Sequence, residues 1–202
     1  IEGLGSALLL LWESVIWLFR PPFRPMLFFQ AMEFVGVGSL FIVVLTGLFT
    51  GMVFSVQTIG IFRLFNAETL VGGTVALALM RELAPVLSSL MVTARVGSAI
   101  ATELGTMQVT EQVDALFTMA VNPVQYLVTP RIVAGALMMP LLTAFCDLVG
   151  IGGSYYVSVH ILNVDGGMFM DKIRLYATSW DVTSGLIKSS VFGVILTLVG
   201  CH

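Results

Sequence analysis

The chain has 202 residues, of which 57% are hydrophobic and 10% are charged, and its formal net charge is −3. Soluble domains carry about 25% charged residues, so this composition leaves too few polar side chains to cover a folded surface in water. It predicts an all-α protein embedded in a lipid bilayer. The acidic balance and the lack of a basic cluster argue against nucleic acid as a partner.

The first segment, residues 1–25, is predicted to be a helix that lies in the membrane interface. Residues 3–19 are apolar but interrupted by Glu13, and the sequence RPPFRP at residues 20–25 ends any helix. An apolar stretch of this length with Trp12 and Trp17 is typical of an interfacial helix. A short membrane-crossing helix is the alternative.

The first predicted span covers residues 34–62, because no charge occurs between Glu33 and Arg63. At about 1.5 Å per residue, this stretch exceeds the roughly 30 Å of hydrocarbon in a bilayer. It contains GLFTG at residues 47–51, a GxxxG pattern. Such a pattern either allows another helix to approach closely or is merely tolerated in a glycine-rich membrane helix.

Three further spans are predicted, and each contains charge. Residues 69–95 contain Arg81 and Glu82 at the midpoint, residues 132–162 contain Asp147, and residues 182–202 contain Lys188. Ionisable groups at bilayer depth are costly unless they face protein or water, so these four are candidate functional residues. Pro85 cannot donate to the carbonyl of Arg81 and should kink the second span there.

The segment between the second and third spans, residues 96–130, contains no stretch suited to crossing a membrane. Thr110 is a suitable N-cap, Glu111 would lie in the first helical turn, and Asn122–Pro123 would end the helix. One face of this helix would carry Val109, Val113, Leu116, Phe117 and Ala120, and the other Glu111, Asp114 and Thr118. This short amphipathic helix either rests on its own protein or docks into a groove of a soluble partner.

Residues suited to catalysis or metal binding are missing from the sequence. It has no GxxxxGK[ST] loop and no Ser/His/Asp, Cys/His or metal-ligand arrangement. Cys146 and Cys201 lie in apolar runs and fit small buried residues, and His160 and His202 are isolated. The chain is therefore predicted not to be an enzyme, to hold no metal or cofactor, and to depend on another protein for energy.

Residues 80–135 resemble the signature of the MlaE/YrbE permease family, the membrane subunits of MCE-associated ABC lipid transporters. The similarity is carried by RELAPV, ARVGSAIATELGTM, TEQVDAL and YLVTPR, in that order and with family-like spacing. A looser likeness covers the whole chain. The resemblance implies a single permease domain over residues 1–202 that works as a pair of copies. It also implies a fifth membrane helix beyond this sequence, and we expect both ends of the chain to be incomplete.

The resemblance also implies partners and a location. The family's coupling helix inserts into an ABC ATPase that binds ATP and magnesium. Here it corresponds to the coupling segment, residues 103–120, with Glu103, Glu111, Gln112 and Asp114 on the docking side. Residues 96–130 would then be cytoplasmic and the protein would lie in a bacterial inner membrane. The other implied partners are a periplasmic MCE-domain protein and a small STAS-type cytoplasmic subunit. The implied activity is movement of phospholipids between inner and outer membranes, which maintains outer-membrane lipid asymmetry.

A lipid path needs an apolar wall for acyl chains and a few polar groups for the head. The second span offers both, since Arg81 and Glu82 are surrounded by Leu77, Met80, Leu83, Leu87 and Leu90. These two charges could instead satisfy packing partners such as Asp147 or Lys188. A rival interpretation joins Arg81, Glu82, Asp147 and Lys188 in the proton relay of an ion-coupled transporter, although no inverted repeat is visible. A simple membrane anchor would leave the charges unexplained.

Overall fold

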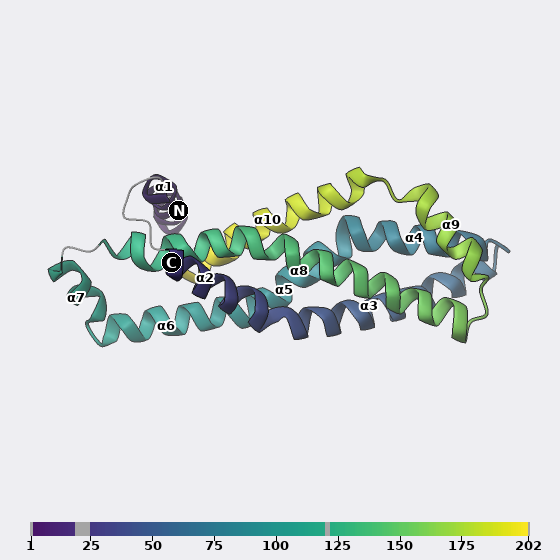
Figure 1. Ribbon diagram of the computed structural model, residues 1–202, viewed down its shortest axis with the longest axis horizontal. Coiled ribbons are helices and arrows are strands. Elements are labelled where there is room, and N and C mark those ends of the chain that lie inside the picture. Colours follow the sequence, from purple (N-terminus) through teal and green to yellow (C-terminus); the bar gives the residue numbers. More distant parts are fainter. Residues whose placement is uncertain (1, 19–24, 120–121, 202) are drawn as a thin grey trace. The chain divides into compact units, whose positions relative to one another are not determined.

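A computed structural model describes residues 2–18, 25–119 and 122–201. Throughout these ranges the secondary structure is helical, without strands. Four helical stretches are long and apolar enough to cross a membrane (Figure 1), namely Pro25–Arg63, Glu68–Val109, Val124–Ile161 and Ser179–Cys201. The prediction of an all-α, multi-pass membrane protein with four spans is therefore confirmed.

Several of the long stretches are interrupted by short π-helical turns or a 3-10 turn. The first stretch consists of α2 (Pro25–Met32), η1 (Glu33–Val37) and α3 (Gly38–Arg63). The second consists of η2 (Glu68–Leu70), α4 (Val71–Ala78), η3 (Leu79–Leu83), α5 (Ala84–Val92), η4 (Thr93–Gly97) and α6 (Ser98–Val109). The third consists of η5 (Val124–Val128), α8 (Thr129–Tyr156) and η6 (Val157–Ile161), and the fourth is α10 (Ser179–Cys201). Three shorter helices accompany them, α1 (Glu2–Leu18), α7 (Gln112–Thr118) and α9 (Gly166–Tyr176).

The contacts within the chain group into two compact units. Unit 1 comprises residues 1–39, 89–139 and 190–202, and unit 2 comprises residues 40–88 and 140–189. The prediction of one permease domain over the whole chain stays a prediction.

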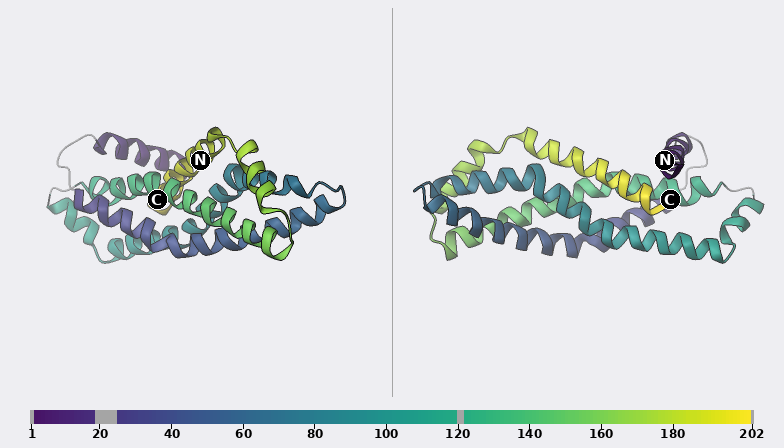
Figure 2. Two further views of the ribbon diagram at one scale, coloured as in Figure 1. Left: turned by 45° about the vertical axis from the view of Figure 1, so that its right-hand side comes forward. Right: turned by 180° about the vertical axis from the view of Figure 1, so that it is seen from behind.

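Unit 2 has an apolar core where α9 packs on α4, which Figures 1 and 2 show side by side. The fully or nearly buried members of this core are Ile59, Val71, Val75, Leu79, Val164 and Phe169. Two glycines allow the close approach: a Cβ at Gly72 would lie 2.5 Å from the carbonyl oxygen of Phe169, and one at Gly73 would lie 2.6 Å from the ring of Tyr176. Nearby, Arg63 donates to the carbonyl of Leu162 (2.8 Å) and pairs with Glu68 (3.2 Å).

The GxxxG pattern of the first span forms a helix–helix contact in unit 2. A Cβ at Gly47 would lie 2.8 Å from Sγ of Cys146, and one at Gly51 would overlap the carbonyl of Gly150. Because both neighbours belong to α8, the close-approach interpretation of this pattern is confirmed, and α3 and α8 pack backbone to backbone here.

Unit 1 contains the apolar cluster of Val128, Ile132 and Leu198, with Leu10 and Leu11 of α1 packed against it. The hydroxyl of Ser14 donates to that of Thr129 (3.3 Å), so one face of α1 contacts the start of α8. The opposite side of α1 is exposed, and Trp12 keeps 67% of its accessible surface. Residues 1 and 19–24, which belong to the predicted interfacial segment, lie outside the described residues.

The helices extend beyond the predicted spans, most of all in the second stretch. The charge of Arg95 predicted an end at residue 95, but the helical stretch continues to Val109. Arg95 does not end the helix because its guanidinium donates to the carbonyl of Phe34 (3.2 Å) and to Ser39 Oγ (3.0 Å). A charge satisfied in this way is no signal for the end of a membrane helix.

Candidate functional site

The charges at the centre of the second stretch lie on the π-helical turn η3. Arg81 and Glu82 are both exposed there, while Leu79 is buried on the other side of the turn. Since the two residues are adjacent, their side chains leave the helix in different directions, and each finds its partner in α10.

Arg81 pairs with Asp181 at the start of α10. Both Nε and Nη2 of Arg81 lie 2.6 Å from Oδ1 of Asp181. The other carboxylate oxygen, Oδ2, accepts the backbone N–H of Thr178 at 2.9 Å. The side chain of Asp181 is only 2% exposed, whereas that of Arg81 is 54% exposed. Asp181 is thus a buried, fixed counter-ion that also caps its own helix.

Glu82 pairs with Lys188, one and a half to two turns further along α10. The Nζ atom of Lys188 donates to Oε1 of Glu82 at 2.7 Å and to the carbonyl oxygen of Arg81 at 3.0 Å. Pro85 has no N–H to donate to that carbonyl, so Lys188 supplies a hydrogen bond at the place where the proline disturbs the helix. The predicted irregularity before Pro85 is present as the π-helical turn η3.

A pocket of about 500 Å³ opens beside these charges, entirely within unit 2. Its walls are formed by Leu70, Gly73, Thr74, Leu77, Ala78, Arg81, Glu82 and Tyr176. The pocket therefore brings together three of the predicted lipid-site residues, Leu77, Arg81 and Glu82. It has a mainly apolar wall and one group of each charge sign at one edge.

The other predicted lining residues lie outside this pocket. Leu83 packs against the core of unit 2, and the backbone of Met80 faces Gly185 of α10. Leu87 is half-buried and Leu90 is 56% exposed. Asp147 on α8 is buried, and its Oδ1 has no hydrogen-bond partner among the described residues. Within the described residues Asp147 makes no ion pair with Arg81 or Lys188 and no hydrogen bond to Glu82, so the four-residue relay is not assembled.

Sequence reasoning missed the counter-ion Asp181 and five residues of the pocket wall, namely Leu70, Gly73, Thr74, Ala78 and Tyr176. Asp181 lies just before the predicted start of the fourth span, yet Thr178-Ser-Trp-Asp181 fits the capping pattern of Ser or Thr followed three residues later by an acid. That pattern could have placed an acid in the first turn of α10. Tyr176 has no comparable signal, because it enters the pocket only through the packing of α9 on α4.

The coupling segment differs from its prediction in several respects, beginning with the role of Thr110. Thr110 ends α6 instead of starting the next helix, since its Oγ1 donates back to the carbonyl of Thr106 (2.8 Å). Glu111 follows with a φ of 56°, a left-handed conformation that is uncommon for residues other than glycine. The chain turns sharply there, and α7 runs across the direction of α6, as Figure 1 shows.

The polar face of the segment is free to meet a partner. Glu111, Gln112, Asp114 and Thr118 are all exposed, and within the described residues the two acids have no hydrogen-bonding or ion-pair partner on their side chains. On the apolar face, Val113 and Leu116 are half-buried. Val109 was assigned to that face, but it belongs to α6 and is 85% exposed, so that assignment is wrong. Ala120 lies outside the described residues.

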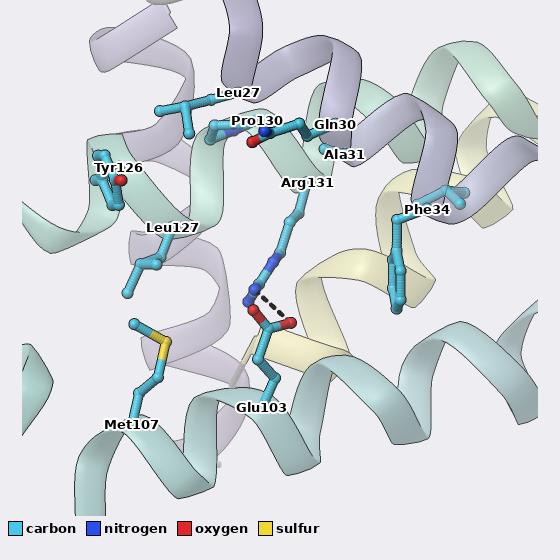
Figure 3. Close-up of a pocket in the computed structure, with 11 residues that line it drawn as sticks. Leu27, Gln30, Ala31, Phe34, Glu103, Met107, Tyr126, Leu127, Pro130 and Arg131 are labelled. Atoms are coloured by element: carbon cyan, nitrogen blue, oxygen red, sulfur yellow. Dashed lines mark ion pairs between the residues drawn. The ribbon is translucent and has the colours of Figure 1, made fainter. Parts of the chain in front are cut away.

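Glu103, the remaining residue predicted for docking, has a partner within unit 1. Its Oε2 lies 2.8 Å from Nη2 of Arg131, whose side chain is 12% exposed. Figure 3 shows this pair in a pocket of about 340 Å³, with Arg131 reaching from α8 towards Glu103 on α6. Among the described residues, no group of three or more His, Cys, Asp and Glu is placed to hold a metal ion.

The chain was also compared with protein families and with known proteins. A family model described as "Permease MlaE" matches residues 28–202. A protein of Rickettsia felis named "Probable ABC transporter permease protein" is 40% identical over 201 residues, which cover 100% of this chain and 78% of that protein. The "Intermembrane phospholipid transport system permease protein MlaE" of Haemophilus influenzae is 39% identical over 202 residues, covering 98% and 76%. The chloroplastic protein TRIGALACTOSYLDIACYLGLYCEROL 1 of Arabidopsis thaliana is 41% identical over 172 residues, covering 85% and 49%.

Proposed function

Because the chain belongs to the MlaE permease family, we propose that it is the membrane subunit of an ABC transporter that moves phospholipids. ATP would be bound and hydrolysed, with magnesium, by a separate ATPase subunit. The name of the Haemophilus relative supports the phospholipid substrate. The chain itself is a transport subunit and contributes binding and movement, not bond cleavage.

The single observation that best supports a lipid-binding site is the pocket beside η3. Its walls include Leu70, Leu77 and Ala78, while Arg81 and Glu82 bring charge to its edge. Phospholipids are amphipathic, so a binding site needs an apolar wall for the acyl chains and polar groups for the head. Both are present at the middle of a membrane-crossing stretch, where charged residues are rare and often mark substrate pathways. Arg81 and Glu82 are paired with Asp181 and Lys188, yet their side chains stay 54% and 66% exposed.

The ion-coupled transporter fits the contacts less well. A proton relay needs groups that release and take up protons in turn, and an arginine does not lose its proton in proteins. Arg81 is held by Asp181 at 2.6 Å, and Glu82 by Lys188 at 2.7 Å. Two separate ion pairs of this kind position charges at a pocket. They do not form a connected proton path.

Coupling to the ATPase is assigned to the exposed acids of α7 and of the turn before it. Asp114 projects from the short helix α7, and Glu111 belongs to the turn of only two residues that joins α7 to α6. A rigid projection of this kind can fill a groove of a soluble subunit. Glu103 would then act differently from its prediction, by bracing α6 through Arg131 and not by direct docking.

The remaining parts of the proposal concern location and assembly. We place the protein in a bacterial inner membrane with residues 96–130 on the cytoplasmic side. A second copy of the chain, a periplasmic MCE-domain protein and a small STAS-type subunit would complete the complex. Its task would be transport between inner and outer membranes in support of outer-membrane lipid asymmetry. The support for these points is the family resemblance of the motifs between Arg81 and Arg131.

Co-purification of the ATPase subunit of the same transport system tests the proposal. The wild-type chain should retain it, and Glu111→Lys and Asp114→Lys should lose most of it, because each reverses a charge on the docking face. Asp171→Lys is the matched control, since it makes the same change on an exposed position of α9. Retention by both variants at the wild-type level would reject the docking assignment. An intact complex without any ATPase would favour the ion-coupled rival.

A further inference from the structure

The pocket beside η3 presents one cation and one anion on adjacent residues. We infer that it selects a zwitterionic headgroup with a primary ammonium, as in phosphatidylethanolamine, over an anionic headgroup such as phosphatidylglycerol. This inference rests on the proposed lipid site and adds the class of lipid to it.

Arg81 supplies the site for the phosphate. A guanidinium has five N–H donors, and Asp181 engages those on Nε and Nη2 through a single oxygen, Oδ1. The donors on Nη1 stay available, and the side chain is 54% exposed at the edge of the pocket. Because both oxygens of Asp181 are occupied, by Arg81 and by the N–H of Thr178, the guanidinium is held in a fixed place. A phosphate can therefore bind without the arginine having to be ordered first.

Glu82 supplies the site for the ammonium. Its Oε1 accepts from Lys188 at 2.7 Å, whereas its Oε2 has no hydrogen-bond partner in the part of the chain that the structure describes. The side chain is 66% exposed and lines the same pocket as Arg81. A primary ammonium carries three N–H donors and can pair with this free oxygen. A quaternary ammonium, as in phosphatidylcholine, has no N–H and gains only the charge attraction.

The balance of charge explains why an anionic lipid is not preferred. Arg81 and Lys188 are matched by Asp181 and Glu82, so the four groups have no net charge. Of these four charged groups, only Arg81 and Glu82 line the pocket. An anionic head would gain from Arg81 and be repelled by Glu82, whereas a zwitterionic head satisfies both. One extra exposed ion pair changes affinity by up to about fivefold, and we expect a preference of that size.

Site-directed photo-crosslinking measures the preference directly. A photoreactive amino acid is placed at Ala78, which lines the pocket, and at Phe41 of α3, which is 77% exposed and serves to sample the surrounding bilayer. The intact transporter complex is placed in nanodiscs of equal parts phosphatidylethanolamine, phosphatidylcholine and phosphatidylglycerol, and the adducts are identified by mass. At residue 78, phosphatidylethanolamine adducts should exceed phosphatidylglycerol adducts about fivefold, while residue 41 should report the input ratio.

Charge removal tests the role of Glu82. Glu82→Gln should bring the adduct ratio at residue 78 to that at residue 41, and Glu82→Asp should keep a preference. Glu68→Gln is the matched control, because it removes an exposed carboxylate from an ion pair in the same unit but outside the pocket. Equal adducts of all three lipids at residue 78 of the wild type would overturn the inference and leave the lipid site standing. Lipid adducts at residue 41 with none at residue 78 would overturn the lipid site itself.

Discussion

At the scale of single residues, prolines and polar side chains of α10 act together. Pro85 deprives the carbonyl of Arg81 of its helical donor, and Lys188 donates to that carbonyl at 3.0 Å. Pro140, inside α8, does the same to the carbonyl of Ala136, and Ser190 donates to it at 3.0 Å. Satisfying such groups matters more in lipid than in water, because no solvent replaces the lost bond.

At this scale the sequence identified Arg81, Glu82 and Lys188 as charges in the membrane, and its alternative of Lys188 as a packing partner is confirmed by the Glu82–Lys188 pair. It did not indicate Asp181 as the partner of Arg81. Arg81, Glu82 and Lys188 were found because ionisable residues are rare at bilayer depth. Their pairing depends on contacts between residues about a hundred positions apart, such as Arg81 with Asp181. No local pattern in either helix contains that information.

Removing the charge of Asp181 should destabilise the fold. Asp181→Asn keeps the shape but weakens the bonds to Arg81 and to the N–H of Thr178, and it leaves Arg81 without its counter-ion. We expect a lower unfolding temperature, measured by thermal denaturation in detergent. Asp171→Asn, an exposed change on α9, is the control and should be neutral. An unfolding temperature of Asp181→Asn equal to that of the wild type would show that the Arg81–Asp181 pair does not hold α10 in place.

At the scale of elements, the spans were predictable and their ends were not. Long apolar stretches with few charges located all four spans, because a bilayer requires about 20 apolar residues in a helix. The second and third spans are longer than predicted, since Glu103 and Arg131 pair with each other at 2.8 Å and so allow helices to continue past charged positions. A helix boundary at Thr110 was predicted correctly, but Thr110 ends the preceding helix, and Glu111 lies in the turn and not in the first turn of the next helix.

The contact between α3 and α8 yields a prediction at this scale. Gly51→Ala should destabilise the protein by about 1–3 kcal/mol, because the added Cβ would overlap the carbonyl of Gly150 in the neighbouring helix. Gly60→Ala, in the same helix, is the control, since its Cβ would have no neighbour within 4 Å. This control should be neutral or slightly stabilising. Thermal denaturation compares the two, and equal unfolding temperatures would contradict the packing of these helices through Gly51.

At the scale of the whole molecule, the function was predicted from sequence motifs and not from composition. Hydropathy and charge indicated a multi-pass protein, and the spacing of RELAPV, TEQVDAL and YLVTPR indicated the permease family, to which the chain belongs. The composition of the pocket could not be predicted in the same way. Tyr176 and Thr74 reach it only because α9 packs against α4. The proposed transporter therefore needs a test that joins the pocket to ATP-driven movement.

Transfer of a labelled phospholipid by the reconstituted complex, with its ATPase and MCE-domain partners, is the most direct such measurement. Thr74→Trp places a large ring at an exposed position that lines the pocket, and Val86→Trp makes the same change at an exposed position outside it. The wild type and Val86→Trp should transfer lipid only with hydrolysable ATP. Thr74→Trp should retain its ATPase but lose transfer. Transfer that is indifferent to ATP, or that continues undiminished in Thr74→Trp, would contradict an ATP-driven lipid path through this pocket.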